Sequence, residues 1–207
     1  MTRNAAGRSA WLGVALLLGA FALVGWPMAR DTLDWQPGLA LREPWRAFTA
    51  VGVHYSGQHL GVNLVGLAVT AAFGVVARAP APLALAWLVA WPVTHVGLLL
   101  EPSLLHYGGL SGVLHAGVAV IVAFLLISGT RAQRGVAAVV AIGGVAKLLN
   151  EAPWGPALRY PAGWDIAIAP IAHTTGAIAG AIAGAIAGAL CAAHAQRVAR
   201  ADSARHA

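Results

Sequence analysis

The stretch His106-Tyr-Gly-Gly-Leu-Ser-Gly-Val-Leu-His115 places Ser111 between glycines at the start of an apolar segment. A serine hydroxyl beside tight glycine turns is one way to present a nucleophile. The same composition also suits packing of two membrane helices, because small residues let their backbones approach closely. The stretch alone does not separate these two roles, so its interpretation depends on the rest of the chain.

The chain around this stretch has the composition of a membrane protein. Of its 207 residues, 59% are hydrophobic and only 10% are charged, and the mean hydropathy is +0.73. A soluble domain carries about 25% charged residues. We therefore expect one all-α polytopic membrane domain over residues 1–207, without a separate soluble domain. The single cysteine, Cys191, has no partner for an internal disulfide.

Six apolar segments approach the roughly 20 residues that a membrane span requires. Helices are expected over residues 10–28, 57–77, 82–100, 108–128, 136–150 and 166–193. An outer loop, residues 29–56, follows the first helix, and a cytoplasmic tail, residues 194–207, follows the last. The first segment is similar to a signal peptide, but Pro27-Met28-Ala29 is a poor cleavage site, so we expect a retained helix.

The distribution of charge predicts the orientation. If the N-terminus is cytoplasmic, that side of the membrane holds eight arginines and one aspartate, whereas the outer side holds five basic and six acidic residues. Cytoplasmic loops of membrane proteins carry such an excess of basic residues. The pI of about 10.7 therefore reflects topology, and no nucleic-acid partner is predicted.

Polar residues inside membrane spans mark functional sites by default. His59 and Asn63 are four residues apart, so they share one face near the outer end of the second helix. Ser111 lies at the outer end of the fourth helix, and His173 lies about two turns into the sixth. These three helices run in the same direction, so the four side chains are expected at one depth. Each alone has a structural explanation as interhelical packing or bonding, but the set indicates a site.

These groups suit acyl transfer. Ser111 would be the nucleophile, and His173 the general base that accepts its proton. The backbone N–H of Ser111, the Asn63 amide and the His59 ring would stabilise the oxyanion. We expect no acidic residue at the depth of His173, so the prediction is a Ser–His dyad, with no metal and no cofactor. Water must reach it through a hydrophilic cavity open to the outer side.

The chain resembles the rhomboid intramembrane serine proteases over essentially its whole length. Four motifs carry the resemblance, in family order: Trp45-Arg46, His54-x4-His59-x3-Asn63, Gly109-Leu-Ser-Gly112 and Ala172-His173-x2-Gly176-x3-Gly180. The resemblance implies a six-helix rhomboid-like bundle with the serine at the start of the fourth helix. It also implies that glycines of the fourth and sixth helices, among them Gly112, Gly176 and Gly180, pack together and support the site.

Position 115 departs from the usual rhomboid pattern. Most rhomboids carry an aromatic residue, usually tyrosine, four residues after the nucleophile, where it stacks on the catalytic histidine. The string Gly-Leu-Ser-Gly-x-Leu-His115 and the short chain resemble the rhombosortase branch instead. His115 would stack on His173, hydrogen-bond it, or only fill the space of the aromatic ring.

The rhombosortase resemblance implies a function and a location. Substrates of this branch end in a Gly-Gly-containing motif, a transmembrane helix and a short basic tail. The chain would be a serine endopeptidase of the bacterial inner membrane that cleaves exported proteins near this C-terminal anchor. Both termini would be cytoplasmic and the active site open to the periplasm. Its partners would be the membrane-anchored protein substrate and the lipid bilayer.

Other interpretations remain open. A general rhomboid protease of broader substrate choice differs only at His115 and in chain length. From another class, His59 and His173 would be able to ligate haem iron, as in a small membrane cytochrome, but this leaves Ser111 and Asn63 unexplained. A transporter is disfavoured, because no pair of matching broken helices is evident.

Two further polar features have simpler predicted roles. Lys147 and Glu151 are expected to form an i,i+4 ion pair. A structural role for the two residues, with the lysine snorkelling to the interface and the acid in a loop, is preferred over a contact with the substrate. His95 is expected to bond a carbonyl freed by Pro92.

Overall fold

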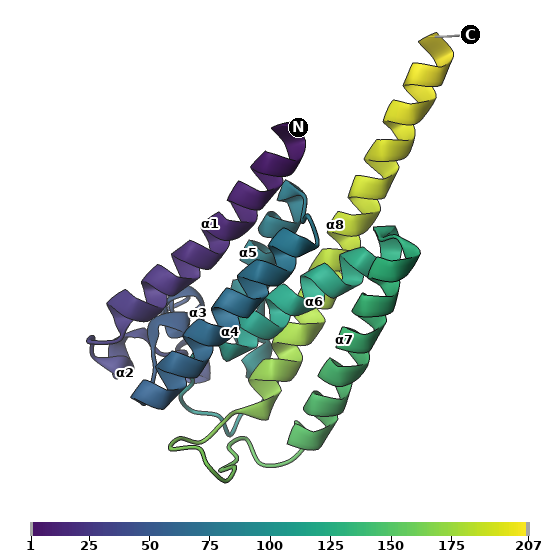
Figure 1. The fold of residues 1–207 in the computed structure, drawn as a ribbon. Coiled ribbons are helices and arrows are strands. Elements are labelled where there is room, and N and C mark those ends of the chain that lie inside the picture. The colour runs from purple at the N-terminus through teal and green to yellow at the C-terminus, as the bar shows by residue number, and fades with distance from the viewer. Residues whose placement is uncertain (1, 206–207) are drawn as a thin grey trace.

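A computed structural model describes residues 2–205 as a helical bundle (Figure 1). Among these residues, six helices are long and apolar enough to cross a membrane. They are α1 (Thr2–Gly25), α4 (Gly57–Val76), α5 (Ala81–Val96, continued by the 3-10 turn Gly97–Leu100), α6 (Ser111–Ser128), α7 (Arg131–Glu151) and α8 (Pro170–Arg205). The predicted all-α polytopic fold is therefore confirmed.

The helix bounds differ from the predicted ones at several ends. α6 begins at Ser111, three residues later than expected, because Gly109 has a φ of +136° that a helix does not allow. α7 begins earlier than expected, at Arg131, where Thr130 and Gln133 form a capping box. α8 begins at Pro170, whose missing N–H is not needed in a first turn.

The predicted tail is largely helical. α8 continues through Arg205, because the residues after Cys191 are mostly alanine, arginine and other helix formers, and residues 206–207 lie outside the described part. Its 36 residues give a length of about 54 Å, and its C-terminal part extends beyond the other helices (Figure 1).

The contact between α6 and α8 forms the centre of the bundle. A Cβ added at Gly176, Gly180 or Gly184 would lie 2.0, 2.1 and 2.5 Å, respectively, from a backbone carbonyl oxygen of α6. Only glycine permits this approach, so the prediction that glycines of these two helices pack together is confirmed. We call Gly176, Gly180 and Gly184 the glycine stripe of α8. The contact fixes the start of α8 beside the start of α6.

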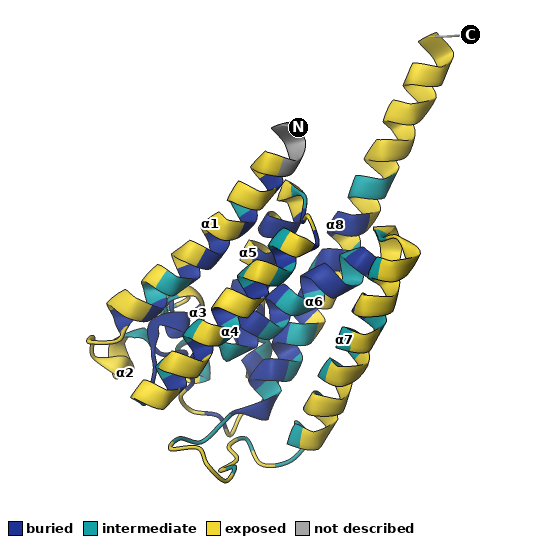
Figure 2. Ribbon diagram, viewed as in Figure 1, coloured by how far each residue is buried: buried dark blue, intermediate teal, exposed yellow. Residues whose placement is uncertain are grey.

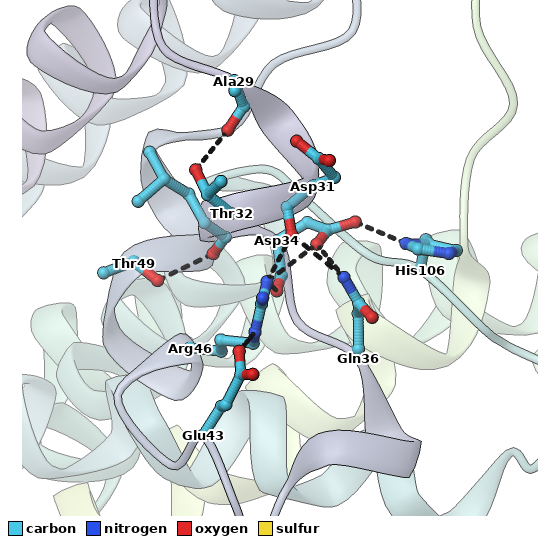
Figure 3. Close-up of polar contacts among 10 residues, drawn as sticks. Ala29, Asp31, Thr32, Asp34, Gln36, Glu43, Arg46, Thr49 and His106 are labelled. Carbon is cyan, nitrogen blue, oxygen red and sulfur yellow. Dashed lines mark hydrogen bonds and ion pairs between the residues drawn. The ribbon is translucent and has the colours of Figure 1, made fainter.

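The segment between α1 and α4 contains four short helical turns: α2 (Arg30–Leu33), a 3-10 turn (Pro37–Leu39), α3 (Arg46–Thr49) and a second 3-10 turn (Ala50–Gly52). Buried Arg46 holds it together by donating to Asp34 Oδ1 at 3.2 Å and to the carbonyl oxygens of Asp31 and Asp34 (Figure 3). The other carboxylate oxygen of Asp34 lies 2.7 Å from His106 Nδ1. The network therefore joins this segment to the residues that precede Ser111.

Backbone hydrogen bonds strengthen the same connection. Trp35 and Tyr107 exchange N–H···O bonds of 2.7 and 2.9 Å, and the Gly109 N–H donates to Ala50 O at 2.9 Å. His95 joins the same segment to α5, since its Nδ1 lies 2.6 Å from Ala47 O on α3. The prediction that His95 bonds a carbonyl freed by Pro92 is therefore wrong, because α3 packs against α5 and offers an acceptor nearer to the ring.

α7 lies at the margin of the bundle. Among its 21 residues only Ala137 is buried, and most of the helix is exposed in Figure 2. Its last turn lies at the end of the bundle where α4, α6 and α8 begin, which we call the site end.

Candidate active site

Ser111 and His173 meet at the site end. Ser111 is the first residue of α6, and His173 lies in the first turn of α8. The Ser111 hydroxyl lies 2.9 Å from His173 Nε2, within hydrogen-bond distance. Both residues are held by the neighbouring glycine contact, because Gly176, three residues after His173, packs directly on the backbone of Gly112, which follows Ser111.

Two polar side chains of α4, those of Asn63 and His59, face the same region. Asn63 is buried, and its amide nitrogen has no hydrogen-bond partner among the described residues. His59 Nδ1 accepts a bond of 3.3 Å from the Tyr55 N–H, so in the neutral ring the proton resides on Nε2. Asn63 and His59 therefore offer N–H donors to the cavity that Ser111 also lines.

Gly109 allows the chain to pass close to these donors. Its φ of +136° is strained for any other residue, and an added Cβ would lie 2.9 Å from His59 Nε2 and 3.9 Å from the Asn63 amide nitrogen. The predicted supporting glycine is thus required by backbone conformation and by space.

His115 stacks on His173. The two ring centroids are 4.4 Å apart and the ring planes differ by 18°. The His115 Nδ1–H donates to the carbonyl oxygen of Ser111 at 2.7 Å, so the ring is fixed in this position. Three roles were expected for His115: stacking on His173, a hydrogen bond to it, or only filling space. The structure shows stacking.

An acidic residue also contacts His173, contrary to the prediction of a Ser–His dyad. Glu151 Oε2, on the last residue of α7, lies 2.7 Å from His173 Nδ1, and Oε1 accepts from Lys147 Nζ at 2.6 Å. The expected Lys147–Glu151 pair is confirmed, but the prediction that no acid lies at the depth of His173 is wrong. The reason is that α8 begins at Pro170, so His173 lies in its first turn, where it meets Glu151 at the end of α7, and not about two turns into the helix.

The two bonds of His173 also bear on the haem alternative. Nε2 is bonded to Ser111 and Nδ1 to Glu151, so neither ring nitrogen is free to ligate iron. This arrangement counts against bis-histidine ligation by His59 and His173.

His54, the first residue of the motif that includes His59 and Asn63, has a supporting position. It is buried, and its ring centroid lies 4.8 Å from that of His59. Burial lowers the pKa of His54 from 6.5 to about 4, so this ring is neutral at pH 7 and adds no charge beside His59.

The site opens into a cavity of about 1100 Å³ that is lined by residues of α4, α6, α7 and α8. Most of its lining is apolar, with the polar groups gathered at the site end. The expectation of a hydrophilic cavity is therefore wrong for most of its extent. Its walls suit the apolar side chains of a membrane-embedded segment better than free water.

Comparison with models of known protein families, with curated protein sequences and with solved structures finds no match for this chain. The class of the protein is therefore defined by its own fold and site. It is an α-helical membrane protein with a hydrogen-bonded serine and histidine at one end of the bundle.

Proposed function

We propose that this chain is an intramembrane serine endopeptidase of the rhomboid type. The observation that carries the proposal is the 2.9 Å contact between the Ser111 hydroxyl and His173 Nε2, in a bundle of helices apolar enough to span a membrane. A serine bonded to a histidine is the pattern of an activated nucleophile. The Asn63 amide nitrogen, which has no acceptor among the described residues, supports the same class of reaction.

The reaction follows from these positions. Ser111 Oγ attacks the scissile carbonyl carbon while its proton passes to His173 Nε2. The carbonyl oxygen becomes an oxyanion, which accepts bonds from the Asn63 amide, His59 Nε2–H and the Ser111 N–H. That N–H lies at the first position of α6, where no intrahelical acceptor exists.

The second half of the reaction restores the enzyme. Collapse of the intermediate breaks the C–N bond, and His173 returns its proton to the leaving amine, which leaves an acyl ester on Ser111. A water molecule then gives its proton to His173 and attacks the ester carbonyl. Release of the carboxylic acid returns the proton to Ser111.

The proposed substrate is a protein with a C-terminal transmembrane helix preceded by a Gly-Gly segment. The apolar cavity between α4 and α7 supports the first part of this assignment, because it offers a membrane-embedded segment a route to Ser111. A Gly-Gly segment has low helix propensity, so the chain unwinds there and its carbonyl becomes accessible. The assignment of a Gly-Gly segment is supported by His115 and by the resemblance to the rhombosortases.

Cleavage of two co-expressed reporters tests the proposal, with Ser111→Ala as the control. One reporter carries a Gly-Gly segment, a transmembrane helix and a basic tail, and the other a generic helix with small residues. We expect Ser111-dependent cleavage of the first only. Cleavage of both would reduce the proposal to a general rhomboid protease, and full cleavage by Ser111→Ala would refute it.

A further inference from the structure

The acidic side chain on α7 extends the hydrogen-bonded pair to three groups. Ser111 on α6, His173 on α8 and Glu151 on α7 are joined by contacts of 2.9 and 2.7 Å. His173 is buried and the Glu151 side chain is only 14% exposed, so water competes weakly for these bonds. The three residues come from three different helices and meet only at the site end.

The direction of the hydrogen bonds fixes the tautomer of His173. Because Nε2 accepts from the Ser111 hydroxyl, the proton of the neutral ring is on Nδ1 and is donated to Glu151 Oε2. Lys147 Nζ lies 3.3 Å from the same Nδ1, but two N–H donors do not bond each other. Both donors instead converge on the Glu151 carboxylate, which uses one oxygen for each.

From these contacts we propose that Glu151 is a positioning residue for His173, completing a Ser–His–Glu arrangement, and that Lys147 holds its carboxylate in place. This inference rests on the proposed protease function. Glu151 keeps His173 in the tautomer that accepts the serine proton, and its negative charge faces the imidazolium formed when that proton arrives. Glu151 remains ionised throughout, so no further proton transfer is required.

The position of Glu151 gives α7 a role in assembling the site. The rest of α7 is mostly exposed, with Ala137 as its buried residue, and Arg159 Nη1 caps its end by donating to the carbonyl oxygens of Asn150 and Glu151. The bond to His173 therefore joins the end of a marginal helix to α8. The base is fully oriented only when the last turn of α7 lies against α8.

The experiment compares Glu151→Gln with wild type in detergent and in lipid vesicles. Glutamine keeps the size of the side chain but removes its charge. Two rates are measured: cleavage of the Gly-Gly reporter, resolved into kcat and KM, and labelling of Ser111 by a fluorophosphonate. In that labelling, Oγ bonds to phosphorus, fluoride leaves, and His173 accepts the proton. Labelling therefore reports activation of the serine without transmembrane substrate.

We expect Glu151→Gln to lower kcat by about 10²- to 10⁴-fold, with KM changed by less than threefold, and to slow labelling similarly. Glu151→Asp, which retains the charge, should recover part of both rates. The matched control is Glu101→Gln, because Glu101 lies in the loop before α6 and, among the described residues, its side chain bonds only Ser103. It should leave both rates unchanged.

The outcomes test two claims separately: the positioning role of Glu151 and the proposed protease function. Wild-type kcat and labelling in Glu151→Gln, or a change confined to KM, would overturn the role of Glu151 and leave the protease proposal intact. A wild-type protein that neither cleaves nor labels would overturn the protease proposal itself. If Glu151→Gln does not fold, shown by loss of cooperative thermal unfolding, the comparison is made with Glu151→Asp and Lys147→Met. Both should then fall below wild type in kcat, and wild-type kcat in both would overturn the inference.

Discussion

At the residue scale, the Asn63 amide is the most informative polar group. A buried N–H donor without an acceptor lowers stability by about 1–3 kcal/mol, so its retention calls for a reason. The reason proposed above is a bond that forms only to the oxyanion. Because such a bond contributes to the transition state and little to substrate binding, its removal should affect kcat and not KM.

We expect Asn63→Ala to lower kcat by about 10²- to 10³-fold, with KM nearly unchanged and thermal stability unchanged or raised. Steady-state cleavage of the Gly-Gly reporter measures this. Val65→Ala, at an exposed position on the same helix that does not line the cavity, is the control and should cleave at the wild-type rate. An unaltered kcat in Asn63→Ala would remove Asn63 from the oxyanion site.

A second residue-scale prediction concerns Arg46. Its side chain and that of Asp34 are 8% and 4% exposed, so Arg46→Ala leaves a carboxylate buried beside His106 without its main partner. Loss of one partner of a buried pair costs about 3–5 kcal/mol. Thermal unfolding in detergent should show this loss, whereas exposed Arg42→Ala should change stability by less than about 0.5 kcal/mol. Equal melting temperatures of the two variants would contradict the structural role of the network.

The sequence predicts some of these residues better than others. Four polar residues are identifiable because each lies in an otherwise apolar, uncharged helix: Ser111, His173, His59 and Asn63. Glu151 is not, because its role depends on the distance between the ends of α7 and α8, and hydropathy contains no information about that distance. The i,i+4 spacing of Lys147 and Glu151 is the only local signal, and it is common on ordinary helices.

At the scale of the elements, the glycine stripe of α8 decides whether serine and histidine meet. We expect Gly176→Ala to destabilise the fold by about 1–3 kcal/mol through overpacking and to reduce activity, because the new Cβ would press on Gly112 O. Thermal unfolding and fluorophosphonate labelling of the same preparations measure both effects.

The control for this prediction is Gly135→Ala on α7. A Cβ at that position would meet no atom within 4 Å, and alanine favours the helix by up to about 1 kcal/mol. Gly135→Ala should therefore be as stable as wild type or more stable. If Gly176→Ala behaved in the same way, α6 and α8 would not be in backbone contact.

The helices themselves are largely predictable, because the length of an apolar run follows from the thickness of the membrane. The ends of the helices are less predictable. The start of α6 depends on the conformation of Gly109, and the length of α8 depends on alanine-rich residues that are neither apolar enough for a span nor polar enough for a loop. The partners of each helix are predictable only where small residues recur, as at Gly176 and Gly180.

At the scale of the whole molecule, the orientation in the membrane remains a prediction from the distribution of arginines. It is tested in a Cys191→Ala background with single cysteines at Ser103 and Ser203, which are both exposed and lie at opposite ends of the bundle. A membrane-impermeant maleimide should label Ser103→Cys in intact spheroplasts, and Ser203→Cys only after permeabilisation. The reverse pattern would invert the topology and place the site end in the cytoplasm.

The separation of Ser111 and His173 along the chain also has a consequence for biosynthesis. They are 62 residues apart, which a ribosome adds in about 3–12 s at 5–20 residues per second. During this interval the nascent chain carries the serine hydroxyl but not the imidazole, and α8 must then insert and pack its glycines on α6. If the chain has the hydrolytic activity proposed above, that activity would therefore be absent until the last helix is made, and a partly synthesised chain would not cleave neighbouring membrane proteins.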